Sequence, residues 1–466
     1  MKVDASIFKT YDIRGTYPDQ LNTGIAYALG RAYATHLIRK NTGNVLRVAV
    51  GGDMRHSTPE LKDAYIRALL ESGISVDDVG VVSTPTLYFS VGYFGHDGGV
   101  QVSASHNPKE WNGFKMTETF GRPISKHSGI TEMQQMVESD TFAPLVKKAH
   151  QGLLRTKSGV VEDLIADQTG FGNPEHRVLP KLKVAIDCGN GMGSVDMKAL
   201  FATQQHTVRW LNETPDGGFP AHEADPMVAH NNVELQETIR AEMCDLGIAA
   251  DGDGDRYFFF DETGAMIPQE IVRGLMAEMI LRDNPGATIV YDVRPGRITR
   301  ELIEGAGGIP KMAPVGHSLI KESMLESDAP FGGESSGHFF FRLPYGTFEA
   351  PVVLVLFFLR WLAEHPGPVS KAIGAYRRYV NSGEINTKLP DRETGLRILE
   401  SLKQKYHDAE HHTLDGLTVE YPEFWFNTRL SNTGGATLRL ILEARDEETM
   451  SRTRDEVLAY IVSEIA

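Results

Sequence analysis

The chain has 466 residues, a formal net charge of −15 at pH 7 and only two cysteines. A single hydrophobic core does not grow to this length, so we expect three or four domains. The acidic balance argues against a general nucleic-acid binder, and two cysteines exclude a disulfide framework and favour a reducing compartment.

Two further features bear on location. Residues 1–6 lack the apolar core of a signal peptide. The longest apolar run, residues 350–359, is too short to span a bilayer and is followed by Arg360, so a buried helix is predicted there. We expect a soluble cytoplasmic protein with neither membrane nor nucleic-acid partners.

A unit made of a strand, a glycine turn and a helix recurs three times in the first three-quarters of the chain. Its strands begin at Arg47, Lys183 and Thr288, and its helices are predicted over 59–72, 194–204 and 297–305. The last strand of each unit, over 100–102, 246–250 and 330–331, runs into an unusual polar loop. Alternating strands and helices predict an α/β protein with mostly parallel sheets, and ligands bind beyond the carboxyl ends of such strands. All three loops lie where this rule places a site.

The tail from about residue 380 has a different pattern. A charged helical segment over 392–407 precedes an aromatic strand over 423–427 and an apolar strand over 437–442. This pattern predicts a small α+β domain with an antiparallel sheet. We expect domains over 1–155, 156–265, 266–378 and 379–466.

The first loop presents Ser105 beside His106, and residues 112–115 are predicted to turn again and to supply Lys115. A serine held at a strand end, with polar groups and a lysine close by, suits a nucleophile or a phosphate carrier. The alternative is an ordinary polar turn, because these residue types all favour turns.

The second loop alternates Asp251, Asp253 and Asp255 with glycines and ends at Arg256. Three carboxylates this close repel one another unless a hard cation neutralises them, so a divalent metal is predicted, and we expect Mg²⁺. An EF-hand is disfavoured, because Arg256 stands where that loop needs glycine and 257–260 reads as a strand. A phosphatase with an aspartate nucleophile stays open.

Two more loops carry binding chemistry. Glu334, Ser336 and His338 offer a carboxylate, a hydroxyl and an imidazole for sugar hydroxyls, against the alternative of an ordinary loop. Residues 429–435 combine Arg429 with small polar residues and two glycines, a pattern typical of a phosphate nest. Cations also lie around a predicted turn over 9–15, and Arg294 and His317 end or follow strands of the third unit, where each residue alone is more often structural.

Taken together, the motifs closely resemble those of the α-D-phosphohexomutase superfamily, and within it the bacterial phosphomannomutase/phosphoglucomutase enzymes. The resemblance covers essentially the whole chain. It rests on Ser-Ala-Ser-His-Asn-Pro at 103–108, Asp-Gly-Asp-Gly-Asp-Arg at 251–256, Gly-Glu-Ser-Ser-Gly-His at 333–338, Arg-Leu-Ser-Asn-Thr at 429–433 and Tyr-Asp-Ile-Arg-Gly at 11–15.

The resemblance implies four domains around a central cleft: a phosphoserine-loop, a metal-loop, a sugar-loop and a phosphate-binding domain. It implies that Ser105 carries a transferable phosphate through a hexose 1,6-bisphosphate intermediate, with Mg²⁺ held by Ser105, Asp251, Asp253 and Asp255. It also implies a sugar-phosphate substrate and a monomer or dimer. The remaining residues that match family positions are His106, Lys115 and Arg256 for catalysis, and Tyr11, Arg14, Arg294, His317, Glu334, Ser336, His338, Arg429, Ser431, Asn432 and Thr433 for substrate binding.

The chain departs from the family pattern at two places. Gly434 and Gly435 replace the usual Glu-Pro of the phosphate loop, and Ser335 replaces the Met of mannose/glucose enzymes or the Gln of glucosamine enzymes. The aromatic approach at 425–427 looks more like the mannose/glucose branch. The leading hypothesis is therefore a mannose and/or glucose phosphomutase. The alternatives are a phosphoglucosamine mutase, a metal-dependent sugar-phosphate phosphatase and a non-catalytic Ca²⁺-binding module.

Overall fold

The computed structural model describes residues 3–43, 45–174, 179–294, 296–431 and 436–465. These residues form two compact units. Unit 1 comprises residues 1–267 and 338–370, and unit 2 comprises residues 268–337 and 371–466. Among the described helices, none is both long enough and apolar enough to cross a membrane.

Unit 1 begins with a six-stranded mixed sheet in the order β1-β5-β4-β2-β3-β6. Only β5 runs against its neighbours, and the other pairings between neighbouring strands are parallel. The strands are β1 (Ile13–Thr16), β2 (Arg47–Gly52), β3 (Ser75–Val81), β4 (Gly98–Val102), β5 (Trp111–Glu118) and β6 (Leu154–Thr156).

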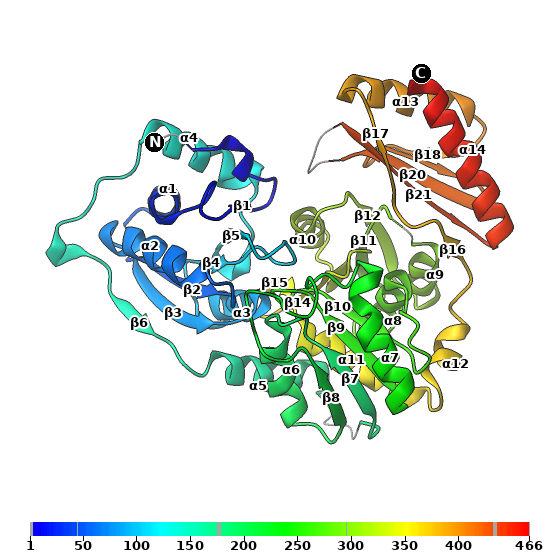
Figure 1. Ribbon diagram of the computed structural model, residues 1–466, viewed down its shortest axis with the longest axis horizontal. Helices are drawn as coiled ribbons and strands as arrows, with labels where there is room; N and C mark the ends of the chain where they lie inside the picture. Colours follow the sequence, from blue (N-terminus) through cyan, green and yellow to red (C-terminus); the bar gives the residue numbers. More distant parts are fainter. Residues whose placement is uncertain (1–2, 44, 175–178, 295, 432–435, 466) are drawn as a thin grey trace. The chain divides into compact units, whose positions relative to one another are not determined.

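Helices cover both faces of this first sheet (Figure 1). α1 (Thr23–Lys40) and α2 (Thr58–Glu71) share a core with alternate residues of the strands, such as Val48 and Val100. α3 (Thr84–Tyr93) packs on β2 and β4 from the other side, and α4 (Thr131–Ser139) packs against α1. Both faces of β4 are therefore buried, and its carboxyl end leads directly to Ser105.

The prediction of a turn over residues 112–115 was wrong, because these residues lie inside strand β5. Asn112 is buried and donates through its side chain to the hydroxyls of Ser57 and Thr58. A Cβ at Gly113 would lie 2.3 Å from the carbonyl oxygen of Ile13 on the neighbouring strand. Glycine therefore serves close strand approach here and not chain reversal.

A second mixed sheet in unit 1 has the order β10-β9-β7-β8. β7 (Lys183–Asp187) lies parallel to β8 (Thr207–Leu211) and β9 (Leu246–Ala250), and β10 (Tyr257–Phe260) returns antiparallel to β9. The sharp return places residues 251–256 at the carboxyl edge of the sheet. Strand β10 begins at the seventh residue counted from Asp251, inside what would be the 12-residue loop of an EF-hand, so the EF-hand alternative was wrong.

The apolar run at 350–359 forms most of α11 (Pro351–Glu364), in which every residue from Pro351 to Leu362 is buried, as predicted. α11 packs against α5 (Val160–Gly172). It follows the antiparallel hairpin of β14 (Phe339–Leu343) and β15 (Gly346–Glu349). The other helices of this part of unit 1 are α6 (Gly193–Ala202) and α7 (Val233–Glu242).

Unit 2 contains a parallel set of strands and an antiparallel sheet. In the parallel set, β11 (Thr288–Asp292) lies between β12 (Ile309–Ala313) and β13 (Phe331–Gly333). The helices connecting or flanking these strands are α8 (Gln269–Leu281), α9 (Arg297–Gly305) and α10 (His317–Glu326). α9 begins and ends where the sequence predicted.

The C-terminal part of unit 2 is the predicted α+β domain. Its strands all pair antiparallel, in the order β16-β21-β20-β19-β18 with β17 also on β21. α13 (Arg392–Lys405) and α14 (Glu447–Ile465) pack on the sheet (Figure 1). The strands are β16 (Val380–Asn381), β17 (Ile385–Lys388), β18 (Glu410–His412), β19 (Leu417–Glu420), β20 (Phe424–Leu430) and β21 (Thr437–Ala444), and α12 (Val369–Gly374) precedes them.

The predicted fold class, three mixed α/β domains followed by an α+β domain, is confirmed. The exact boundaries near residues 155, 265 and 378 stay predictions.

Candidate functional site

Ser105 lies in a left-handed turn directly beyond β4. Its φ is 54°, and its amide donates to the hydroxyl of Ser103 at 2.9 Å. Its side chain is held on two sides: Oγ donates to Oδ2 of Asp251 at 3.1 Å and lies 3.2 Å from Nδ1 of His106. Gly252 packs so closely that an added Cβ would lie 2.3 Å from the Ser105 carbonyl oxygen. The turn and the acidic loop therefore fit together through glycine.

Arg55 fixes the backbone of this turn. Its guanidinium donates to four main-chain carbonyls, those of Ser105 at 2.7 Å, Asn107 at 2.6 Å, Pro108 at 2.7 Å and Trp111 at 2.9 Å. The side chain is fully buried and pairs with Asp53 at 3.2 Å. Sequence reasoning missed Arg55, although its place just beyond the carboxyl end of β2 was a usable signal.

Asp251, Asp253 and Asp255 converge as the sequence predicted. One oxygen from each lies within 4.8 Å of the others, and all three side chains are buried. Within the described residues, Oδ1 of Asp253 and Oδ1 of Asp255 are buried and accept no hydrogen bond. An all-oxygen donor set with unsatisfied carboxylate atoms fits a hard divalent cation.

The charges around the triad are only partly balanced. Lys115 Nζ lies 2.6 Å from both Asp253 and Asp255, and Arg256 Nε lies 2.9 Å from Asp251. Burial raises the pKa of all three carboxyls, but the Lys115 ammonium outweighs this for Asp253 and Asp255, whose pKa values are lowered. Burial and the Asp255 charge raise the pKa of Asp251 to about 7. Three carboxyl groups are thus in contact with two permanently basic side chains, Lys115 and Arg256.

His106 and Arg14 complete the surroundings of Ser105. Burial, followed by the charges of Arg256 and Arg14, holds the pKa of His106 well below its usual value. Arg14 lies on β1, pairs with Asp12 at 2.7 Å and donates to the side chain of Asn107 at 2.6 Å. Tyr11 precedes the same strand and is partly buried.

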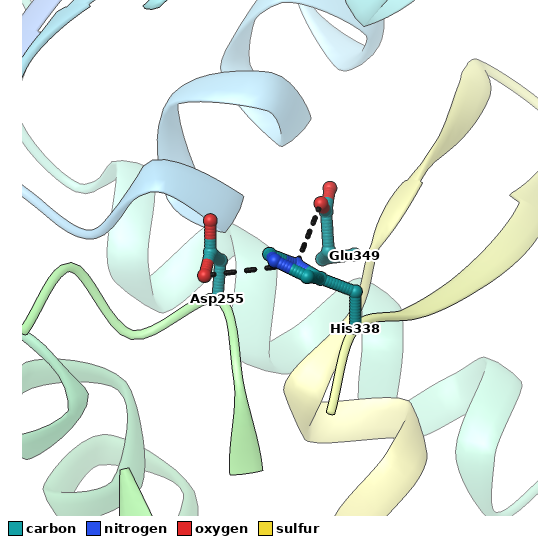
Figure 2. A group of neighbouring side chains, drawn as sticks. All are labelled: Asp255, His338 and Glu349. Carbon is teal, nitrogen blue, oxygen red and sulfur yellow. Dashed lines mark ion pairs between the residues drawn. The ribbon is translucent and has the colours of Figure 1, made fainter. Parts of the chain in front are cut away.

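His338 lies beside the triad and brings a carboxylate that the sequence did not reveal. Its Nδ1 is 3.8 Å from Oδ1 of Asp255 and 3.3 Å from Oε1 of Glu349 (Figure 2). Glu349 ends β15, eleven residues after His338 in the sequence, and belongs to none of the motifs. Only the pairing of β14 with β15 brings the two together.

In unit 2, the predicted sugar loop follows β13. Glu334 accepts from the Gly316 amide at 2.7 Å and from the Ser336 hydroxyl at 3.3 Å. Arg294 pairs with Asp292 at 2.5 Å and donates to Ser336 at 3.3 Å. His317 is the first residue of α10, directly after Gly316. The structure therefore brings together Glu334, Ser336 and Arg294. His317 directly follows Gly316, whose amide binds Glu334.

Ser335, the residue at which the chain departs from the family pattern, is bound to the end of β11. Its hydroxyl donates to Oδ1 of Asp292 at 3.0 Å, and Arg273 pairs with the same carboxylate at 2.8 Å. Asp292 thus links the loop to the end of β11 through its hydrogen bond with Ser335. Asp292 could have been singled out from the sequence only by its position at the end of a strand.

The predicted phosphate loop follows β20 in the C-terminal domain. Arg429 is buried and its guanidinium binds Glu384, which also pairs with Arg439 at 2.9 Å. Arg439 donates to the hydroxyl of Ser431 at 3.2 Å. Asn432 and Thr433, which the sequence also assigned to this loop, lie outside the described residues. Glu384 was missed by sequence reasoning.

The domain series and the buried serine–aspartate cluster are those of a phosphohexomutase. Family models described as phosphoglucomutase/phosphomannomutase, alpha/beta/alpha domains I, II and III, match residues 5–144, 167–264 and 269–379. Phosphomannomutases of Escherichia coli and Methanocaldococcus jannaschii are 35% and 34% identical to the chain. Each alignment covers 97% of this chain, and the alignments cover 98% of the first relative and 97% of the second.

A solved structure is similar over the whole chain. The phosphoglucomutase/phosphomannomutase family protein of Burkholderia thailandensis superposes with a TM-score of 0.89 at 30% identity, over 99% of this chain and 98% of that one. The chain belongs to the phosphoglucomutase/phosphomannomutase family. It is an enzyme of the mutase class, an isomerase.

Proposed function

We propose that the enzyme interconverts the 6-phospho and 1-phospho forms of mannose and/or glucose through a phosphoserine at Ser105. The observation that carries this proposal is the position of Ser105 Oγ, between Asp251 and His106 in a turn held by Arg55. The similarity to two phosphomannomutases over nearly the whole chain supports it.

In the first transfer, the bond between Ser105 Oγ and phosphorus breaks as a bond forms to the free hydroxyl oxygen of the sugar monophosphate. The hydroxyl proton leaves to a protein base, and Ser105 Oγ takes up a proton. His106 Nδ1, 3.2 Å from Oγ, is placed to carry that proton. The hexose 1,6-bisphosphate then returns its other phosphate to Ser105.

A phosphoryl group in transfer spreads negative charge over its oxygens, so nearby cations lower the barrier. Lys115 and Arg256 are the cations nearest the acidic loop, at 2.6 Å and 2.9 Å from its carboxylates. Asp251, Asp253, Asp255 and the oxygen on Ser105 would hold Mg²⁺, and their unsatisfied oxygens fit it. When bound, that ion supplies further positive charge to the phosphoryl oxygens.

The remaining residues of the proposal bind the rest of the substrate. Arg429 offers a planar fork for the phosphate that is not being transferred, together with Ser431 and with Asn432 and Thr433 beyond the described residues. Glu334, Ser336 and His338 bind sugar hydroxyls in this proposal. The supporting contacts come from Tyr11, Arg14, Arg294 and His317.

The sugar identity rests on finer evidence. The hydroxyl of Ser335 donates to Asp292. As a serine, this residue offers the sugar neither a thioether nor an amide. The aromatic approach at 425–427 resembles that of the mannose/glucose branch of the family. Phosphoglucosamine mutase is therefore the second candidate, and a sugar-phosphate phosphatase is a distant third.

We also propose a cytoplasmic enzyme that acts as a monomer or dimer. The two cysteines, Cys188 and Cys244, are buried free thiols, which suits a reducing compartment.

Intact-mass and peptide-mass spectrometry of the purified chain test the carrier. After incubation with glucose 1,6-bisphosphate, the wild type and Ser103→Ala should gain one phosphoryl group on Ser105, and Ser105→Ala should gain none. Ser103 is the matched control, because it lies in the same loop and its hydroxyl accepts a hydrogen bond from the Ser105 amide. Turnover at the wild-type rate in Ser105→Ala would overturn the mechanism.

A substrate panel then tests identity. Coupled assays should give the highest kcat/KM with mannose 1-phosphate and glucose 1-phosphate, and a low value with glucosamine 1-phosphate. A preference for glucosamine phosphate would select the second candidate. Steady release of inorganic phosphate without isomerisation would select the phosphatase.

A further inference from the structure

A second group of potential metal ligands adjoins the acidic triad. It consists of Asp255, His338 and Glu349, with one ligand atom of each within 4.8 Å of the others (Figure 2). The three come from separate elements, namely the loop after β9, the residue before β14 and the end of β15. All three belong to unit 1.

The spacing of these atoms suits a small tetrahedral ion. Two ligands bound at about 2 Å to a tetrahedral Zn²⁺ lie about 3.3 Å apart. His338 Nδ1 lies 3.3 Å from Oε1 of Glu349 and 3.8 Å from Oδ1 of Asp255. Small side-chain shifts would therefore bring all three into one coordination shell.

The atoms facing this position are buried and held. The side chains of Asp255 and Glu349 are 2% and 3% exposed, and Oδ1 of Asp255 accepts no hydrogen bond within the described residues. The His338 ring lies parallel to that of Phe340, with centroids 6.0 Å apart. His338 itself is 17% exposed, which leaves a route for an ion.

The donor set differs in kind from that of the triad. Three carboxylates suit Mg²⁺, whereas one imidazole nitrogen with two carboxylates suits Zn²⁺ and similar borderline metals. We propose that Asp255, His338 and Glu349 form a second metal site that binds Zn²⁺. Zn²⁺ there engages Asp255 and His338, two residues of the proposed Mg²⁺ and sugar sites, and so inhibits turnover.

Calorimetric titration of the full chain with Zn²⁺, in saturating Mg²⁺, tests the site directly. The wild type should bind one Zn²⁺, and Glu349→Gln should weaken that binding more than about 100-fold, since it removes a direct ligand. Asp251→Asn is the matched control, because it removes a carboxylate of the triad but none of the second site. It should keep the Zn²⁺.

A second pair of measurements guards against an unfolded variant. Thermal melting should show that Glu349→Gln is folded, and Co²⁺ as a probe should give the visible bands of a tetrahedral ion in the wild type but not in His338→Gln. Equal Zn²⁺ affinity in the wild type and Glu349→Gln, or no Zn²⁺ bound by the wild type, would leave only a His338 ion pair and overturn the proposal.

The binding arm does not depend on the proposed mutase reaction. The inhibition arm does: at constant Mg²⁺, Zn²⁺ should inhibit the wild type at concentrations that leave Glu349→Gln active. Zn²⁺ binding without mutase turnover would keep the metal site and reject the proposed function. Turnover with equal inhibition of both forms would reject the site alone.

Discussion

The two units handle charge in opposite ways. In unit 1, three buried aspartates and Glu349 face Lys115, Arg256 and His338, so carboxyl groups outnumber the basic side chains that contact them. In unit 2, each arginine of the candidate site already contacts a carboxylate that a second arginine shares: Arg294 and Arg273 bind Asp292, and Arg429 and Arg439 bind Glu384.

This difference suggests two ways of accepting a ligand. A cation arriving at the triad in unit 1 relieves repulsion and meets oxygens that are already in place. A phosphate arriving at Arg429 in unit 2 competes with Glu384 for the same guanidinium. Four substitutions test this comparison, and we take them from the largest expected effect to the smallest.

Asp253→Asn should lower kcat about 1,000-fold and raise the Mg²⁺ concentration needed for half-maximal activity. The change removes one triad carboxylate and frees Lys115 from its 2.6 Å contact, and a lost catalytic ion costs several kcal/mol. Mg²⁺ titrations of initial rate measure both values. Asp261→Asn, in the turn after β10, is the control and should keep the wild-type Mg²⁺ requirement. An unchanged Mg²⁺ requirement in Asp253→Asn would remove this aspartate from the metal site.

Glu443→Gln should stabilise the C-terminal domain by about 3 kcal/mol at pH 8 and have little effect at pH 4.5. Burial raises the pKa of Glu443 from its ordinary 4.5 to about 7, and the neutral indole of Trp425 is its donor at 2.9 Å. The folded domain therefore holds a proton that the unfolded chain releases. The stability this provides is full below about pH 4.5 and is lost as pH rises through 7.

Hydrogen exchange of the β20 and β21 amides during urea titrations at pH 8 and pH 4.5 measures the free energy of unfolding of the C-terminal domain. Glu410→Gln, on the same sheet but 70% exposed, is the control and should show little difference between them. A wild-type domain that is as stable at pH 8 as at pH 4.5 would contradict the expectation.

Arg55→Lys should lower kcat about 100-fold with little change in KM, because a single ammonium cannot serve four carbonyls and the Ser105 turn would shift. Steady-state kinetics separates the two constants. Arg31→Lys is the control: this arginine is buried in the same domain and binds the Ala143 carbonyl, away from the turn. Equal kcat in the two variants would mean that Arg55 stabilises the fold but does not position Ser105 for catalysis.

Glu384→Gln should lower KM for the sugar phosphate about fivefold, near 1 kcal/mol, and leave kcat almost unchanged. It removes the carboxylate that competes for Arg429 and Arg439. Glu400→Gln, on the exposed side of α13, is the control. A raised KM would instead mean that Glu384 orients Arg429 for phosphate, and the contrast between the units would then disappear.

Sequence reasoning found the residues that lie within short motifs. Ser105 and the three aspartates follow buried strands and are spaced by residues with strong turn chemistry, so local pattern and the carboxyl-edge rule both mark them. The same turn chemistry misled at Asn112 and Gly113, which serve close packing inside β5. Arg55, Glu349 and Glu384 were missed, because their roles come from tertiary contacts that no local spacing encodes.

The left-handed backbone at Ser105 also decides which hydroxyl amino acid can stand there. Serine and threonine offer the same oxygen for phosphorylation, yet a β-branched residue is a severe outlier at φ 54°. Ser105→Thr would therefore keep a hydroxyl for the proposed phosphoryl transfer but strain the turn. The backbone, more than the hydroxyl group, disfavours threonine at this position, and a search for distant members of the family can count threonine there as evidence against the proposed mechanism.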